Sequence, residues 1–281
     1  MPSRAATREY ALVTALVAGC LVALILATDL KTEGTAAFRD PGWDRHVYIE
    51  MATTNPLDFH LSPYGWRVLV PTIEHILPSD LQPTFFTITF LSLLGAGVLM
   101  YALARRWFPP GVAVLAVPAF ASFGWAVKFN LADFWLVDPA AYLFLLGSLV
   151  AMSRRRFVVA AVLMLIGVLA KESVMAAAPL AWTLNARSVR DWRALKTSPL
   201  VAAPAAVALV LIRVLIPSHN GDPSYIATLP PAISRFPELF PRYWYPSLLH
   251  DIGYEQRFQS LGPDLIAAYT YRPLTIVLLV L

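Results

Sequence analysis

The sequence predicts an all-α polytopic membrane protein, and three observations support this fold class. Of its 281 residues, 58% are hydrophobic and only 14% are charged, and the mean hydropathy is +0.60, outside the range of water-soluble domains. Apolar windows close to the length of about 20 residues that crosses a bilayer recur along the chain. Basic residues gather between these windows. We therefore expect one membrane domain over residues 1–281, with about seven to eight transmembrane helices.

The windows define the expected spans in order along the chain. They cover residues 10–28, 84–104, 111–127, 134–152, 157–170, 174–186 and 199–216. An eighth begins near Pro273, and the chain stops inside it, so the sequence is expected to be truncated there. The first window follows a short basic leader and has no small-residue cleavage site after it, which predicts a retained helix and not a signal peptide.

The basic residues predict the orientation of these spans. Clusters at Arg4 and Arg8, at 105–106, at 154–156 and over 187–196 fall at alternate ends of the windows, as expected for cytoplasmic loops. Two long loops, at about residues 29–83 and 217–272, then lie on the outer face of the cytoplasmic (inner) membrane with all five histidines. The pI of about 9.3 reflects this topology and not one dense basic patch, so no nucleic-acid partner is expected.

Residues 42–71 of the first outer loop form a charged and aromatic insert between two apolar windows, and we expect the chemistry of the protein to take place there. Residues 46–52 and 67–77 have the composition of two short helices lying along the outer interface. The second outer loop, 217–272, is rich in proline and aromatic residues and is expected to form an irregular lid.

Asp44 opens the first of these helices, directly after Gly42 and Trp43. A carboxylate near the positive end of a helix dipole could serve as a general base; an ordinary helix cap or a solvated loop acid is the alternative. His46 and Tyr48, in the same helix, are candidates for a supporting role.

Arg67 and Lys171 are candidate phosphate ligands. Arg67 lies among aromatic residues and prolines, where a guanidinium could bind a phosphate with two hydrogen bonds, contact lipid headgroups or form an internal salt bridge. Lys171 and Glu172 interrupt an apolar stretch, and charges at membrane depth persist when they are paired or line a wet cavity. Glu172 is expected to be the counter-ion of Lys171.

Two further acids and several aromatic residues complete the candidate site. Asp133 and Asp138 flank the start of the fourth span on its outer side, where either could be a second acid; Asp138 precedes Pro139 and could simply begin a helix. Trp43, Tyr64 and Trp66 could stack on sugar faces or belong to the aromatic belt at the headgroups. No cofactor is predicted, because the histidines are scattered and do not have the spacing of metal ligands. A requirement for a divalent metal ion is left as an alternative.

Together these residues resemble the GT-C superfamily of integral-membrane glycosyltransferases, specifically its bacterial, poorly characterised branch that uses polyprenyl-phosphate sugars. The resemblance rests on alternating topology and on four short motifs. The motifs are Asp44 followed by Tyr48, the run Pro63, Arg67 and Pro71, the Asp138–Pro139 pair, and the turn Leu-Ala-Lys-Glu-Ser over residues 169–173. Members of this family usually have more spans than this sequence, and they have a further C-terminal region that is not found in it.

The resemblance implies a GT-C-like helical bundle that acts in the cell envelope. It implies transfer of a sugar, with inversion, from a polyprenyl-phosphate donor to a glycan, lipid or protein acceptor at the outer face of the membrane. Asp44 would occupy the position of the catalytic base. Arg67 and Lys171 would neutralise the departing lipid phosphate.

Two other function classes fit the same residues. A transporter or lipid flippase would use Lys171 and Glu172 to line a substrate path, since carriers build binding sites at broken helices. A catalytically silent scaffold of the same fold is the third reading. Covalent turnover separates the glycosyltransferase from both, and net movement of solute identifies the transporter.

Overall fold

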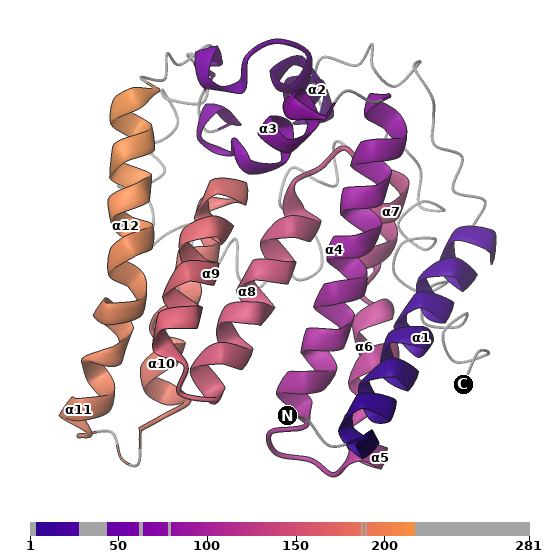
Figure 1. Ribbon diagram of the computed structural model, residues 1–281, viewed down its shortest axis with the longest axis vertical. Helices are drawn as coiled ribbons and strands as arrows, with labels where there is room; N and C mark the ends of the chain where they lie inside the picture. Colours follow the sequence, from indigo (N-terminus) through magenta and orange to yellow (C-terminus); the bar gives the residue numbers. More distant parts are fainter. Residues whose placement is uncertain are drawn as a thin grey trace, which may run out of the picture.

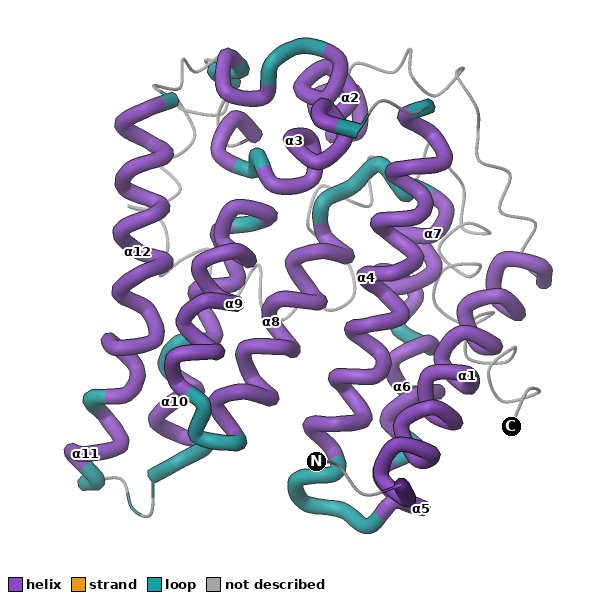
Figure 2. Tube along the Cα trace, in the orientation of Figure 1, coloured by secondary structure: helices purple, strands orange, loops and turns teal. Residues whose placement is uncertain are grey.

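A computed structural model describes residues 4–27, 44–61, 64–77, 80–186, 188 and 190–216 (Figure 1). Helices dominate these ranges, and no strand occurs within them (Figure 2). Five longer helices form the body of the bundle: α1 (Arg4–Ala27), α4 (Leu81–Ala104), α8 (Asp138–Ser153), α9 (Phe157–Ala170) and α12 (Thr197–Leu215). Their axes are roughly aligned; α1, α9 and α12 run in one direction, and α4 and α8 run in the opposite direction (Figure 1).

Short helices fill the connections from α4 to α8 and from α9 to α12. Between α4 and α8 lie α5 (Pro110–Ala113), α6 (Ala116–Ala121), the π-helix η4 (Gly124–Phe129) and α7 (Asn130–Ala132). Between α9 and α12 lie the 3₁₀-helix η5 (Glu172–Ala177), α10 (Leu180–Thr183) and α11 (Trp192–Leu195).

The helix lengths support a helical membrane protein, but the expected seven to eight spans are not confirmed. Three helices of the described residues are long and apolar enough to cross a bilayer: Arg4–Leu26, Leu81–Ala104 and Thr197–Leu215. A fourth crossing is added if Pro110–Ala121 and Ala126–Ala132, bent by 60°, count as one broken span. Helices α8 and α9 are apolar but shorter. The eighth expected span and the second outer loop lie outside the described residues.

Two expected spans are replaced by broken segments. Window 174–186 forms η5 and the single turn α10, with Pro179 at the junction, where it cannot donate a backbone hydrogen bond. Window 111–127 is divided among α5, α6 and η4. Hydropathy predicted each window as one membrane span, but neither forms one continuous helix.

The helices pack around two groups of buried apolar residues. One joins α8, α9 and α12 to the helices at the end of the bundle, and the other joins α1, α4 and α6. At Gly167 of α9, an added Cβ would lie 2.8 Å from Phe144 Cβ of α8. A glycine therefore permits the close approach of these two helices, as is common for helix pairs in membranes.

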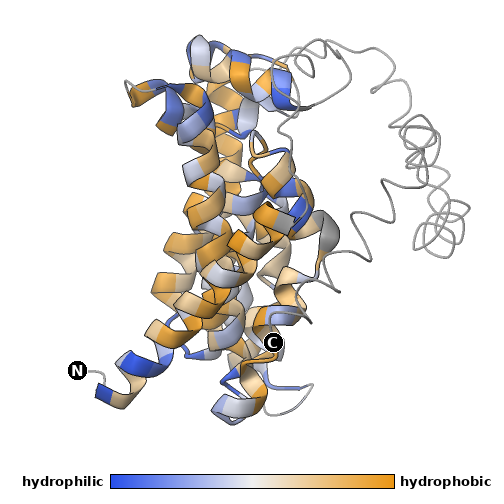
Figure 3. Ribbon diagram, turned by 90° about the vertical axis from the view of Figure 1, so that its right-hand side faces the viewer, coloured by the Kyte–Doolittle hydropathy of each residue, from blue (hydrophilic) through white to orange (hydrophobic). Residues whose placement is uncertain are grey.

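The two ends of the bundle differ in chemistry. Helix α1 begins at the end that carries the α4–α5 and α8–α9 connections and α11 (bottom of Figure 1). Arginines occupy those connections, at 105–106, 154–156 and 190. At the other end, short helices from residues 44–77 form a layer above α9 and beside the upper end of α4 (Figures 1 and 3). We call this layer the cap.

Candidate functional site at the capped end of the bundle

The cap contains both helices that were expected in the first outer loop. They are α2 (Asp44–Thr53) and α3 (Leu69–Ile76), joined by two 3₁₀ turns, η2 (Pro56–Asp58) and η3 (Tyr64–Trp66). Asn55 fixes the start of η2, because its side chain accepts a hydrogen bond from the Leu57 amide at 3.2 Å. Helix α3 buries Val70, Pro71 and Glu74 and contacts α4 and α9. The cap is thereby fixed to the bundle.

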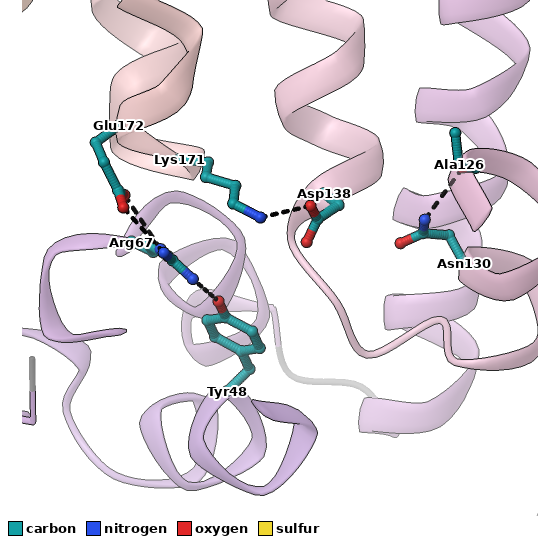
Figure 4. Close-up of polar contacts among 7 residues, drawn as sticks. All are labelled: Tyr48, Arg67, Ala126, Asn130, Asp138, Lys171 and Glu172. Carbon is teal, nitrogen blue, oxygen red and sulfur yellow. Dashed lines mark hydrogen bonds and ion pairs between the residues drawn. The ribbon is translucent and has the colours of Figure 1, made fainter. Parts of the chain in front are cut away.

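Arg67 connects the cap to the turn after α9 (Figure 4). Its Nε and Nη2 donate to the two carboxylate oxygens of Glu172 at 3.1 and 2.9 Å, and its Nη1 donates to the Tyr48 hydroxyl at 3.0 Å. A two-bonded arginine–carboxylate pair is the strong form of this interaction. Of the alternatives for Arg67, the structure therefore contains the internal salt bridge.

A second ion pair joins α9 to α8. Lys171 Nζ lies 2.6 Å from Asp138 Oδ1, at the first residue of α8 (Figure 4). The expectation that Glu172 is the partner of Lys171 is corrected by this arrangement. The Lys171 backbone is extended, with φ −160° and ψ 129°, and neighbouring side chains of extended backbone point to opposite sides. Lys171 and Glu172 therefore reach different partners.

Burial and charge act together on the Arg67–Glu172 pair. Arg67 is only 8% exposed. Burial by itself would raise the pKa of Glu172, but the hydrogen bonds and the charge of Arg67 outweigh it and hold that pKa below its ordinary value. Both partners are therefore charged at neutral pH, and each compensates the desolvation of the other.

The predicted aromatic residues of the loop make contacts inside the cap. Tyr64 packs edge-on against Tyr48 with ring centroids 5.8 Å apart, and the Arg67 guanidinium lies 5.5 Å from its centroid. Trp66 donates from Nε1 to the Ile216 carbonyl at 3.3 Å, and Arg213 of α12 lies 4.5 Å from its ring centroid. These contacts tie η3 to α12, while sugar stacking by Tyr64 and Trp66 stays a prediction.

The other predicted site residues lie at or near the ends of two short helices, α2 and α7. Asp44 begins α2, one helical turn before Tyr48, and its side chain lies outside the described part of the structure, as does Trp43. His46 is half-buried in the first turns of α2. Asp133 is 5% exposed and ends α7, just before the turn into α8.

Sequence reasoning missed two buried charged residues near this end of the bundle. Glu74 is 2% exposed and Lys128, in the π-helix η4, is 4% exposed. Glu74 lies four residues after the buried Val70, so helical periodicity places it on the same face of α3. That spacing is readable in the sequence, but glutamate is rarely fully buried, so the residue type argues against the interior.

Gly65 in η3 is required by the close approach of another part of the cap. An added Cβ would collide with the Phe59 carbonyl oxygen, a backbone atom that cannot rotate away. Gly65→Ala is expected to lower the free energy of unfolding by about 1–3 kcal/mol, the usual cost of overpacking. Thermal unfolding of the full chain measures this loss. Gly111→Ala is the control, since its Cβ would meet nothing within 4 Å.

No protein-family model, curated protein or solved structure matches this chain. Within the described ranges, no group of three or more His, Cys, Asp and Glu side chains is placed to hold a metal ion. The ion pairs Arg67–Glu172 and Lys171–Asp138 are therefore the main evidence for a functional site.

Proposed function

We propose that this protein is a membrane glycosyltransferase of GT-C type that moves a sugar from a polyprenyl-phosphate donor to an acceptor, with inversion. One observation carries the proposal. Helix α2, which begins at Asp44, carries Tyr48, and Arg67 links Tyr48 to Glu172 in the turn after α9. We propose that this framework holds Asp44 and a cation of the bundle end together, as transfer from a lipid phosphate requires.

The contacts separate the roles of the two basic residues. Arg67 already donates from Nε, Nη1 and Nη2 to Glu172 and Tyr48, so we assign it to positioning the cap. Lys171 has one partner, Asp138, and its side chain is 28% exposed. An ammonium group has three donors, so Lys171 can donate to Asp138 and also to a phosphate oxygen. We assign it to the departing polyprenyl phosphate.

The proposed location is the cytoplasmic membrane, with the N-terminus in the cytoplasm and the cap on the outer face. The supporting observation is the gathering of arginines in the connections at the end where α1 begins. Short basic loops favour the cytoplasmic side. Sugar donor, membrane lipid and acceptor would then meet at the outer surface.

A transporter is the second candidate. The break between α9 and η5 places Lys171 and Glu172 at the end of an apolar helix, and broken helices carry the binding sites of many carriers. In that case net movement of solute would occur without formation of a new bond. A catalytically silent scaffold would show neither.

The test uses purified full-length chain in nanodiscs with a panel of polyprenyl-phosphate sugars and a cell-envelope acceptor extract. Release of free polyprenyl phosphate is expected for one donor. Lys171→Gln is expected to lower the release rate by about 10²-fold, since it removes the cation from the leaving group. Lys196→Gln, exposed at the opposite end, is the matched control.

Two results would contradict the proposal. Absence of release with every donor, together with solute flux in proteoliposomes, identifies a transporter; absence of both identifies a scaffold. Equal rates for Lys171→Gln and wild type remove Lys171 from the leaving-group site. Thermal unfolding of each variant distinguishes a chemical effect from loss of the Lys171–Asp138 pair.

A further inference from the structure

A cleft of about 670 Å³ lies beside the cap, where α2 and α3 end and α4 begins. Its lining residues are Ala52, Thr53, Glu74, His75, Leu77, Asp80 and Leu81. Two of these side chains are carboxylates, and none is lysine or arginine. The cleft therefore has a negative charge that no lining residue balances.

Glu74 is the unusual member of this lining. It is 2% exposed, and neither carboxylate oxygen accepts a hydrogen bond within the described chain. Glu172 and Asp138, by contrast, each pair with a cation. Burial raises the pKa of Glu74 to about 7. A buried carboxylate without a partner is unfavourable, and it becomes stable when it takes up a proton or meets a cation.

Two other lining groups can accept hydrogen bonds. His75 Nδ1 lies 3.1 Å from the Ala52 carbonyl oxygen, and because a carbonyl only accepts, Nδ1 carries a proton. The neutral ring then has Nε2 as an acceptor. The Thr53 hydroxyl donates to carbonyl oxygens of α2, at Ile49 and Glu50, and its own oxygen can still accept. Leu77 and Leu81 add apolar surface.

A wall of acceptors and carboxylates is complementary to a donor-rich cation. We infer that this cleft binds a primary ammonium group carried on a short apolar chain, with Glu74 as the carboxylate partner. An ammonium ion offers three N–H donors and needs one carboxylate, whereas a metal ion needs a converging set of ligands, which the described residues do not form. The inference goes beyond the proposed sugar transfer and does not depend on Asp44, because it concerns binding alone.

The test measures binding of n-butylamine to the full chain in phosphatidylcholine nanodiscs by ligand-observed NMR. Wild type is expected to bind n-butylamine and not n-butanol, which lacks the charge. Glu74→Gln keeps the shape of the side chain and is expected to weaken binding by about tenfold or more, the effect of losing a charged partner. Glu50→Gln, exposed on α2, is the matched control and should bind as wild type does.

The pH dependence provides a second readout. Binding is expected to weaken as the pH falls through about 7, where Glu74 takes up a proton. The ammonium stays charged, because alkylamines titrate near pH 10. His75 and Asp80 also line the cleft, so the series is repeated with Glu74→Gln. The Glu74-dependent part should vanish in that variant.

The source of the ammonium group is tested by changing the lipid. Phosphatidylethanolamine nanodiscs present a primary ammonium group at the lipid surface. If this lipid weakens the binding of n-butylamine, the natural ligand is an aminolipid headgroup; if binding is unchanged, it is a soluble amine. Both outcomes support the cleft as an ammonium site. Three results would overturn the inference: equal affinity of Glu74→Gln and wild type, binding of n-butanol with the affinity of the amine, or displacement of the amine by Mg²⁺ at lower concentration. Asp80→Asn is included so that the result does not depend on one variant.

Discussion

Replacing Asp44 by asparagine is expected to lower the rate of polyprenyl phosphate release by about 10²- to 10⁴-fold, the contribution of a general base. The substitution removes the proton acceptor and keeps the size of the side chain. Asparagine also begins helices as well as aspartate does, so α2 should still start at residue 44. The variant is therefore expected to unfold at the same temperature as wild type.

The measurement compares single-turnover release by Asp44→Asn and wild type in nanodiscs with the donor sugar that wild type uses. Glu50→Gln is the control, because Glu50 is an exposed acid of the same helix. A variant that retains release within about threefold of wild type would assign the base elsewhere, since such a change is far smaller than the loss of a general base. In that case Asp133, buried at the end of α7, is the next acid to replace.

Arg67→Ala is expected to have the largest effect on stability. It removes the partner of a half-buried carboxylate, leaves the Tyr48 hydroxyl without its donor, and removes the cation beside Tyr64. Loss of one partner of a buried ion pair costs about 3–5 kcal/mol. Because the Glu172 side chain is 31% exposed and gains some hydration, we expect a loss near the lower limit, about 3 kcal/mol.

Reversible unfolding of the full chain in an SDS titration measures this loss. Arg156→Ala, exposed in the α8–α9 connection, should change the free energy of unfolding by less than about 0.5 kcal/mol. The double variant Arg67→Met, Glu172→Met should recover much of the loss, since apolar groups of similar volume can replace a buried pair. A double variant as unstable as Arg67→Ala would show that the pair does not hold the cap.

The parts of the fold that followed from the sequence are those with a strong local signal. Long apolar windows predicted α4 and α12 to within a few residues, and the pattern of the first loop predicted α2 and α3. Hydropathy averages over a window, however, and does not report whether the backbone is continuous. The windows at 111–127 and 174–186 are apolar but form one- and two-turn pieces.

The candidate site was predictable in composition but not in pairing. The sequence indicated Arg67, Asp138, Lys171 and Glu172, and the structure brings all four together under the cap. Adjacency in sequence suggested that Lys171 pairs with Glu172, whereas the extended backbone at Lys171 separates them. A partner 33 residues away, Asp138, is set by the packing of α8 on α9, which no local pattern contains.

The tether between Trp66 and Ile216 has a consequence for biosynthesis. Tyr48 and Arg67 emerge early from the ribosome, but the Glu172 carboxylate follows Arg67 by 105 residues, and the Ile216 carbonyl follows Trp66 by 150. The nascent first loop therefore has an arginine and a tryptophan without their final partners while most of the bundle is still being inserted. The bond from Arg67 to Glu172 needs the end of α9, and the bond from Trp66 needs the end of α12, so the full set of cap contacts requires the chain as far as residue 216.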